Sequence, residues 1–395
     1  MLPRSSHRAS IGARNADRPD VSVIITAYNV GRFIRQAIFS ALDQTLRGIE
    51  VIVVDDGSTD DTAAEIARAR DPRLRIIRQS NQGASQARNA GLEAARAPLV
   101  AFLDGDDYWR PEKLEKQARF MAVHPEIDLS FVLCTVVDED GAVLVVPSPG
   151  PTRPLSFYDL LVENYIRNGS TVVVRREALL EQGGFDPSFP ACNDYEAWLR
   201  VAASREHNVE CLPEVLTFYR RREGQISADW RRMRDAFQAL LEKMERIAPQ
   251  QTRDARAGAV QNMYRYLAIL AYKNGEVATS ASLLCASLRS SPYGFVTDSR
   301  SLLIAAAVAN RALLGAERYR TVERWAARFW NRGSTSDPAQ SRAHPHPLPQ
   351  RPLVGDPDGK VPASASAHAP NVSPLALPAP LGRLNCRDSL HNPEH

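Results

Sequence analysis

The chain has 395 residues, of which 44% are hydrophobic and 24% are charged, and its formal net charge is +3. This is the composition of a globular protein with one or two domains, and five isolated cysteines without a CxxC pair argue against a disulfide framework or a zinc site. The first twenty residues are polar, and no apolar stretch approaches the ~20 residues of a membrane-spanning helix, so a cytoplasmic location is expected.

The ends of the chain differ in composition from its middle. Residues 1–18 are polar and rich in arginine, and residues 333–395 hold 12 of the 27 prolines but no Phe, Trp, Tyr, Ile or Met. Such segments cannot bury enough apolar surface to offset their ordering entropy, so a disordered head and tail are predicted. Between them, residues 19–227 carry 23 basic and 31 acidic side chains, whereas residues 228–332 carry 17 and 9. This split predicts two functional parts, and the acidic first part argues against a nucleic-acid partner.

Two kinds of apolar pattern alternate through the first hundred residues. Short β-branched runs predict buried strands at Val21–Thr26, Glu50–Val54, Leu74–Arg78 and Leu99–Leu103. Apolar residues at helical spacing predict helices at 33–42, at a segment that ends at Ala69 and is capped by Thr59 or Asp60, and at Ala84–Arg96. This alternation is typical of βαβ units around a mostly parallel sheet.

Polar residues follow three of these strands, namely Thr26–Asn29, Asp55-Asp56 and Asp104–Asp107. Because ligands bind beyond the carboxyl ends of parallel strands, we expect four or five carboxylates to converge at one edge of the sheet. Clustered carboxylates repel one another unless a cation joins them, and Asp104 and Asp106 together offer the hard oxygen ligands that Mg²⁺ or Mn²⁺ prefers. No glycine-rich phosphate loop follows any strand, so a bound diphosphate would rely mainly on the metal.

Two other interpretations of this acidic edge remain open. One is a solvated turn without a ligand. The other is a signalling receiver domain, which carries an acidic pair after a strand. A receiver domain is much shorter than this chain, and it would give Asp104 and Asp106 no role.

Beyond residue 107 the strands no longer alternate regularly with helices. The runs Leu129–Val137 and Val143–Val146 flank an acidic turn and predict a β-hairpin. Val172–Val174 predicts a further strand, and Asp194–Ala203 predicts a helix. Residues 228–332 contain helical signals only.

The basic part contains two helical features of interest. Two helices joined at Asn274-Gly275 resemble one tetratricopeptide-like pair, and a lone pair must pack on a neighbour because it cannot bury a core by itself. In the segment 311–332, an apolar stripe that includes Trp325 and Phe329 is surrounded by arginines. This pattern has two interpretations, a peripheral helix at an anionic membrane surface or a helix docked on the acidic part of the protein.

Seven motifs occur in a fixed order along the acidic part: Val21–Asn29, Val51–Asp61, Asn81–Gly91, Val100–Trp109, Gly183–Asp186, Asn193–Arg200 and Tyr219–Ser227. Together they resemble family 2 glycosyltransferases, and the resemblance covers about half of the chain. It implies a GT-A fold, which is an α/β nucleotide-diphospho-sugar transferase fold with a Rossmann-like mixed sheet. The expected organisation is then a catalytic domain at 19–227, an α-helical extension at 228–332 and the Pro-rich tail.

The resemblance also assigns roles to individual residues. The nucleotide would contact Thr26, Ala27, Tyr28, Asn29, Asp56, Arg88 and Asp104. Asp106, with Asp104 as a second candidate, would hold Mg²⁺ or Mn²⁺. Asp194 would be the catalytic base, with a helix N-cap role as an alternative that does not exclude it. Trp198 would line the acceptor site or belong to the core.

Two positions depart from the family pattern. Asn193 stands where the family usually has Glu, and Arg222 stands where many members have His. An arginine binds phosphate directly, so Arg222 is a candidate contact for the diphosphate. The departures bear on the metal site more than on the fold.

The resemblance implies an inverting, metal-dependent glycosyltransferase of the hexosyltransferase type. It would move a sugar from a nucleotide-diphosphate donor, with UDP-sugar favoured, to a hydroxyl of a glycan or lipid-linked acceptor in cell-surface polysaccharide or glycoconjugate synthesis. A nucleotidyltransferase-like enzyme is one alternative, but its basic phosphate-activating loop is not evident. A non-catalytic scaffold that uses the helical region is another, but it needs neither Asp106 nor Asp194. If the protein is peripheral at the inner face of the membrane, the segment 311–332 would be the part that contacts the lipid surface.

Overall fold

The computed structural model describes residues 18–314 except 148, 190 and 223. The predicted tail lies wholly outside the described residues, and the predicted head and the 311–332 segment lie almost wholly outside them. Contacts divide the chain into two units, 1–309 and 310–395, and the description below concerns the first.

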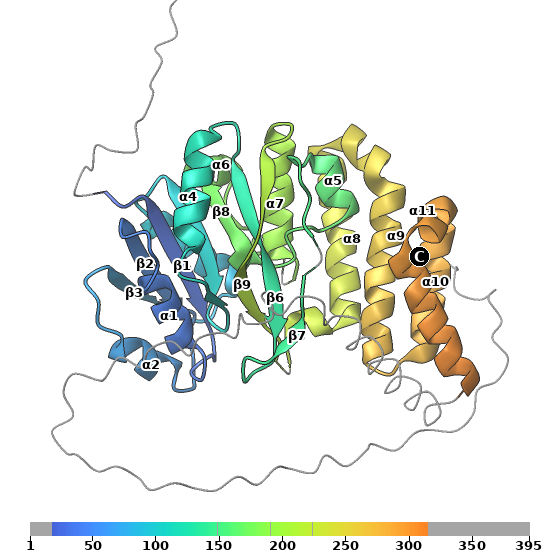
Figure 1. Ribbon diagram of the computed structural model, residues 1–395, viewed down its shortest axis with the longest axis horizontal. Coiled ribbons are helices and arrows are strands. Elements are labelled where there is room, and N and C mark those ends of the chain that lie inside the picture. The colour runs from blue at the N-terminus through green and yellow to red at the C-terminus, as the bar shows by residue number, and fades with distance from the viewer. Residues whose placement is uncertain (1–17, 148, 190, 223, 315–395) are drawn as a thin grey trace, which may run out of the picture. The chain divides into compact units, whose positions relative to one another are not determined.

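A single mixed sheet of nine strands forms the centre of the described part of the chain, in the order β3-β2-β1-β4-β8-β6-β9-β5 with β7 paired to β6 (Figure 1). The strands are β1 (Val21–Ala27), β2 (Ile49–Asp55), β3 (Leu74–Arg78), β4 (Leu99–Asp104), β5 (Tyr108–Trp109), β6 (Leu129–Val137), β7 (Val143–Val145), β8 (Val172–Arg175) and β9 (Val209–Arg220). The first four run parallel, and β8 lies antiparallel to both β4 and β6.

Helices cover both faces of this sheet because successive strand residues point to opposite sides. Those of the first part are α1 (Ile34–Leu42), α2 (Thr62–Arg68), α3 (Ala84–Ala94), α4 (Lys113–Val123), α5 (Phe157–Val162), α6 (Arg176–Glu181) and α7 (Asn193–Ser204). On one face, Ile24 and Ile52 join a core with residues of α3, α5 and α7. On the other face, Val23 and Val51 join a second core with residues of α1, α2 and α4.

The helices that follow residue 228 pack on the sheet part and on one another. They are α8 (Trp230–Ile247), α9 (Pro249–Lys273), α10 (Val277–Ser290) and α11 (Pro292–Thr297), and residues 299–309 are helical as well. α9 contacts α5, α8 and α10, and Figure 1 shows these helices side by side. Leu240 and Met244 of α8 and Ala259 of α9 belong to the same apolar core as α7. The domain boundary at 227 therefore stays a prediction.

Most predicted elements of the first hundred residues are confirmed. The four parallel strands match the predicted runs to within one residue at either end, while α3 ends at Ala94 instead of Arg96. The cap of α2 is Asp61 by position, yet the Asp60 carboxylate accepts the Thr62 amide at 2.9 Å and serves the same purpose. The predicted hairpin and the turn at Asn274-Gly275 are also present; Gly275 has a φ of +84°, which glycine adopts without strain.

β9 and α4 are elements that the sequence pattern did not predict. β9 contains Pro213, which has no amide to donate, and its register with β6 shifts twice, between Val132 and Leu133 and between Leu133 and Cys134. These shifts break the period of two that marks a half-buried strand.

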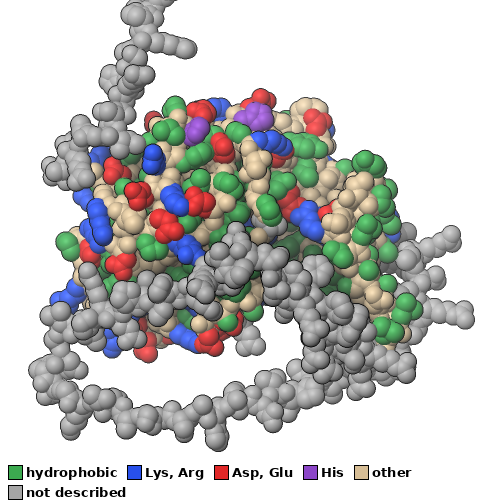
Figure 2. Space-filling view, in the orientation of Figure 1, with side chains coloured by type: hydrophobic (Ala, Val, Ile, Leu, Met, Phe, Trp, Pro, Cys, Tyr) green, Lys and Arg blue, Asp and Glu red, His purple; other side chains and the backbone are tan. Residues whose placement is uncertain are grey.

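The C-terminal helices leave several large apolar side chains exposed. Among the helices that the structure describes, none combines the length and the apolar character that crossing a membrane requires. Exposed apolar residues nevertheless gather there, including Tyr293, Val296 and Leu303, and Figure 2 shows apolar side chains over α10 and α11. The membrane contact predicted for 311–332 remains a prediction.

Candidate active site

The carboxyl ends of β1, β2 and β4 meet at one edge of the sheet, as the sequence predicts. Pairing places Ala27 opposite Asp55 and Thr26 opposite Asp104. The Thr26 hydroxyl donates to Asp104 Oδ1 at 3.4 Å. Gly105 donates its amide to the Thr26 carbonyl, and a Cβ at Gly105 would lie only 2.9 Å from that oxygen. Glycine is therefore required where the turn Asp104–Asp107, called the acidic turn below, crosses the end of β1.

The loop after β1 has a fixed shape and one free aromatic face. Asn29 adopts a left-handed conformation with φ of +51°. Its side-chain oxygen accepts the Thr59 amide at 2.9 Å, and its own amide donates to the Ser58 hydroxyl at 3.1 Å. These bonds tie the loop to the turn after β2. Tyr28 next to it is 45% exposed, so its ring is accessible to a planar ligand.

Asp56 is buried at the end of β2 and is largely occupied by protein donors. Its Oδ1 accepts the Gln79 side chain at 2.8 Å and the Gln82 amide at 2.9 Å, and its Oδ2 accepts the Gly83 amide at 2.9 Å. A carboxylate has about four acceptor positions, so one remains on Oδ2. This leaves Asp56 able to accept one further donor.

Asp107 is held entirely by the protein. Its Oδ1 accepts the Arg220 amide at 2.8 Å, and its Oδ2 accepts the Ser170 hydroxyl at 2.7 Å and the Asn168 side chain at 3.0 Å. This carboxylate therefore fastens β9 and the loop before β8 to the acidic turn. Sequence reasoning missed this role, because nothing local to Asn168 or Ser170 indicates that they meet residue 107.

Arg88 joins two parts of the site that are far apart in the chain. From α3 it donates Nη2 to Asp104 Oδ1 and Nη1 to Asn193 Oδ1, each at 2.7 Å. Burial alone would lower the pKa of Arg88, but the charges of Asp104 and Asp194 outweigh burial and raise it. Arg88 is therefore a fixed cation between β4 and the start of α7.

Arg222 pairs with Asp106. Its Nε lies 2.6 Å from Asp106 Oδ2, and it stands two residues after the end of β9. The neighbouring Arg220 points elsewhere, since its guanidinium donates to the carbonyls of Asp106, Asp138 and Glu139 and to the Gln36 side chain.

Asp194 lies at the start of α7, close to the loop before β8. The helix cap position is Cys192, whose φ is +57°, so the predicted N-cap role of Asp194 is not observed. A Cβ on Gly169 would lie 3.4 Å from Asp194 Oδ2, which shows how closely that loop approaches. The carboxylate accepts the Tyr195 amide through Oδ1 at 2.8 Å.

Burial dominates the electrostatics of three of these carboxyl groups. It raises the pKa of Asp106, to which the charge of Asp104 adds and which Arg222 opposes. It raises the pKa of Asp107 well above its usual value, together with the charges of Asp106 and Asp104. It also raises the pKa of Asp194, with Arg88 acting against it and Asp104 with it. The cluster therefore holds its negative charge at a cost that a bound cation would relieve.

The donor set for a metal ion consists of two carboxylates. In the described ranges no group of three or more His, Cys, Asp or Glu side chains is placed to hold a metal. One oxygen each of Asp104 and Asp106 has no hydrogen-bond partner there. Mg²⁺ is commonly held by one or two carboxylates plus substrate phosphates and water, so these residues fit such an ion when a diphosphate completes its shell.

Trp198 belongs to the core. It is almost fully buried and packs against Phe102 and Phe185, with ring centroids 5.8 and 5.5 Å away. The alternative of an acceptor-lining role is therefore wrong for this side chain.

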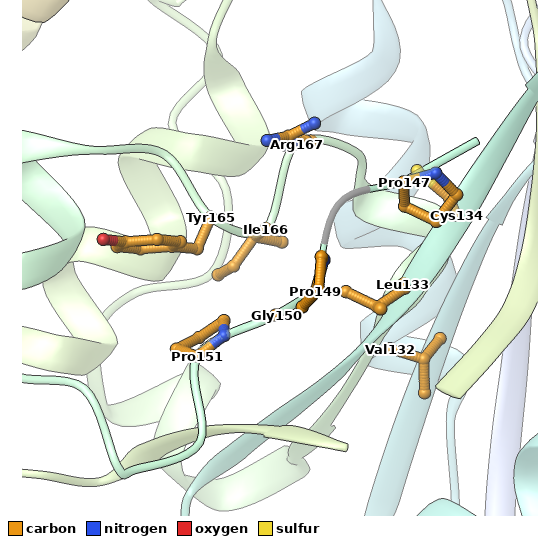
Figure 3. A pocket seen from close by; sticks show the side chains of 10 residues that line it. All are labelled: Val132, Leu133, Cys134, Pro147, Pro149, Gly150, Pro151, Tyr165, Ile166 and Arg167. Carbon is orange, nitrogen blue, oxygen red and sulfur yellow. The ribbon is translucent and has the colours of Figure 1, made fainter. Parts of the chain in front are cut away.

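A hollow is lined by residues of β6 and of the segments around 147–151 and 165–167 (Figure 3). Ten residues line it: Val132, Leu133, Cys134, Pro147, Pro149, Gly150, Pro151, Tyr165, Ile166 and Arg167. Cys134 lies between the charges of Asp107 and Arg167, which respectively raise and lower its pKa, although burial dominates and brings it to about 11. Arg167 directly precedes Asn168, one of the side chains that hold Asp107. The hollow and the carboxylates therefore share one loop.

Comparison with known proteins begins with the family. Residues 22–179 match the model described as "Glycosyl transferase family 2". The chain is 34% identical over 216 residues to the Escherichia coli UDP-Glc:alpha-D-GlcNAc-diphosphoundecaprenol beta-1,3-glucosyltransferase WfaP, covering 53% of this chain and 80% of that one. It is 33% identical over 216 residues to the putative teichuronic acid biosynthesis glycosyltransferase TuaG of Bacillus subtilis, covering 54% and 83%.

Solved structures resemble the chain over a longer stretch. Residues 1–349 of S. aureus TarS, in complex with UDP, give a TM-score of 0.52 at 18% identity and cover 75% of this chain and 92% of that one. The mannosyltransferase PcManGT of Pyrobaculum calidifontis, in complex with GDP-Man and Mn²⁺, gives 0.51 at 22% identity and covers 77% and 83%. At such identities the likeness shows the fold, which is the predicted GT-A type with C-terminal helices.

Proposed function

The chain belongs to glycosyl transferase family 2, and on that premise we propose that it is an inverting transferase that moves a sugar from a UDP-sugar to a hydroxyl group of a glycan or lipid-linked acceptor. The observation that carries this proposal is that Arg88 joins Asp104, in the acidic turn after β4, to Asn193 at the start of the helix that carries Asp194. Neither the nucleotidyltransferase nor the scaffold alternative receives support from this family membership.

The donor site is proposed at the ends of β1, β2 and β4. The exposed ring of Tyr28 would stack on the base, within the loop that runs from Thr26 to Asn29. Asp56 would accept a donor of the uracil ring at its remaining acceptor position, and Asp104 would meet the ribose. A UDP-sugar is favoured because the name of WfaP specifies UDP-Glc and TarS was crystallised with UDP.

Asp194 is proposed as the general base. As the acceptor oxygen bonds to the anomeric carbon, the bond from that carbon to the UDP oxygen breaks, and the acceptor proton passes to Asp194. A single displacement of this kind inverts the anomeric configuration. Burial raises the pKa of Asp194, which makes its carboxylate a stronger base than an exposed Asp.

The leaving diphosphate gains negative charge during this displacement. Mg²⁺ or Mn²⁺ held by Asp106, with Asp104 as the second ligand, would supply Lewis-acid neutralisation of that charge. Arg222, which is paired with Asp106, would add a direct contact to the diphosphate.

The acceptor is proposed to reach Asp194 across the loop 165–169. The hollow in Figure 3 borders this loop and offers apolar walls with one arginine at its edge. WfaP and TuaG are named for a lipid-linked sugar diphosphate and for teichuronic acid synthesis, which supports a role in cell-surface polysaccharide assembly.

Thermal shift with a panel of nucleotide sugars, with and without Mn²⁺, tests this proposal. We expect UDP-sugars to stabilise the protein more than GDP-sugars do, and Mn²⁺ to increase the shift. Asp106→Asn should remove the increase due to Mn²⁺. If no nucleotide sugar stabilises the protein, the proposed function is wrong.

A further inference from the structure

We propose that Arg222 is a cation built into the donor site, so that a nucleotide diphosphate binds there without a divalent metal. This inference rests on the proposed function, because it concerns the same site. In this proposal, Arg222 and the metal act at different stages. Arg222 contributes to binding of the nucleotide diphosphate, and the metal contributes when the diphosphate leaves the sugar.

The position of Arg222 is fixed by the strand that precedes it. The backbone amide of Arg220 donates to Asp107 Oδ1 at 2.8 Å, and the Arg220 guanidinium donates to the Asp106 carbonyl at 2.9 Å. The end of β9 is thus fastened to the acidic turn at two points. Two residues later, Arg222 Nε reaches Asp106 Oδ2 at 2.6 Å. The guanidinium is therefore held next to the turn before any ligand arrives.

Arg222 keeps donors available after it has paired. Only its Nε has a hydrogen-bond partner within the described ranges, so both terminal nitrogens are left for a ligand. The side chain is 29% exposed while that of Asp106 is 11% exposed. A guanidinium that presents two parallel N–H groups matches the oxygens of a phosphate, which it binds in a bidentate manner.

The other two arginines of the site have no such capacity. Arg88 is 6% exposed and uses its terminal nitrogens on Asp104 and Asn193. Arg220 is buried, and its guanidinium donates its hydrogen bonds to three backbone carbonyls and to the side-chain oxygen of Gln36. Of the three arginines that bond to Asp104 or to the turn Asp104–Asp107, Arg222 is therefore the one whose terminal nitrogens have no partner within the described ranges.

Arg222 also limits what a metal adds to binding. A divalent ion at Asp106 would share that carboxylate with the guanidinium, and the two cations would repel each other at this range. The gain in nucleotide affinity from the metal should therefore be smaller than if Asp106 were unpaired. This expectation separates a built-in cation from an ordinary surface arginine.

Isothermal titration of the full chain with UDP and with uridine, in EDTA and in Mn²⁺, tests the proposal. The variants are Arg222→Gln, Arg222→Lys and the control Arg221→Gln, which removes an exposed arginine at the neighbouring position. We expect the wild type to bind UDP in EDTA within about tenfold of its affinity in Mn²⁺. Arg222→Gln should weaken UDP binding in EDTA by roughly 10- to 100-fold, which is the range for a charged hydrogen-bonded contact.

Three further results complete the test. Uridine lacks the diphosphate, so its affinity should be the same in Arg222→Gln as in the wild type, which also shows that the variant is folded. Arg222→Lys should retain part of the UDP affinity, and Arg221→Gln should retain all of it. A wild type that binds UDP only in Mn²⁺ overturns the proposal while leaving the proposed function intact, and so does equal loss in Arg222→Gln and Arg221→Gln. A protein that binds neither UDP nor uridine in either buffer overturns the proposed function as well.

Discussion

Lys243 of α8 forms an ion pair with Glu196 of α7, with 2.6 Å between Nζ and Oε1. Glu196 is fully buried and also accepts two hydrogen bonds from Arg200, while Lys243 makes a second ion pair with Asp186 at 2.6 Å. A residue beyond position 227 thus holds the helix that begins next to Asp194. The C-terminal helices are therefore part of the support of the site.

The first prediction concerns this ion pair. Lys243→Met keeps the length and apolar stem of the side chain but removes its charge. Because Arg200 still neutralises Glu196, we expect a loss of about 2 kcal/mol in the free energy of unfolding, less than for an orphaned buried carboxylate. Urea denaturation measures this loss. Arg246→Met on the same helix is the control, and an equal effect of both variants would contradict the prediction.

The pH dependence of stability provides a second prediction. Burial alone would raise the pKa of Asp186, but hydrogen bonds from Lys243 and Ser188 outweigh burial and lower this pKa to about 2. A carboxyl group with a lowered pKa stabilises the fold above its unfolded pKa of ~3.9 and loses that contribution as pH falls through 2. The wild type should therefore lose more stability between pH 4 and pH 2 than Lys243→Met does. Parallel curves for the two proteins would refute this explanation.

Truncation at residue 227 tests the predicted domain boundary. Such a fragment loses Leu240, Met244 and Ala259, which fill the core behind α7. We expect the fragment 19–227 to bind a dye for exposed apolar surface and to lack a cooperative melting transition. A fragment 19–332 should melt like the full chain. A cooperative melt of 19–227 would support an independent catalytic domain.

The sequence predicts the parallel half of the sheet and its polar edge well, for a physical reason. Strands β1, β2 and β4 are buried on both faces, so they are nearly continuous apolar runs, and each ends at a polar cluster. The contact between Arg88 and Asp104 joins residues only 16 positions apart, so it lies within the part of the chain whose strands and helices the pattern predicts. β9 was missed because Pro213 and its shifts of register obscure the alternation.

Contacts between distant residues lie beyond what the pattern predicts. Asp107 belongs to the predicted acidic turn, yet its partners Asn168, Ser170 and Arg220 come from two other elements. The pairing of Arg222 with Asp106 likewise depends on how β9 ends beside β6. The roles of the site residues therefore remain predictions that experiments must test.

The pH dependence of activity gives a further prediction. Burial raises the pKa of Asp194, so the base is protonated at a higher pH than an ordinary Asp. Activity should be present above that raised pKa and should fall as pH drops through it. Asn193→Asp places another carboxylate beside Asp194, so the acidic limb of kcat/KM should move to higher pH. An unmoved limb in this variant would argue that another group titrates.

Substitution of Asp194 tests the central claim most directly. Asp194→Asn removes the base and keeps the size of the side chain, so UDP binding by titration should stay within about threefold, while sugar transfer from the UDP-sugar should fall by roughly 10²–10⁴-fold. The product anomer, read by NMR in the wild type, should be inverted relative to the donor. Full transfer activity in Asp194→Asn, with UDP binding unchanged, would contradict the assignment of Asp194 as the general base.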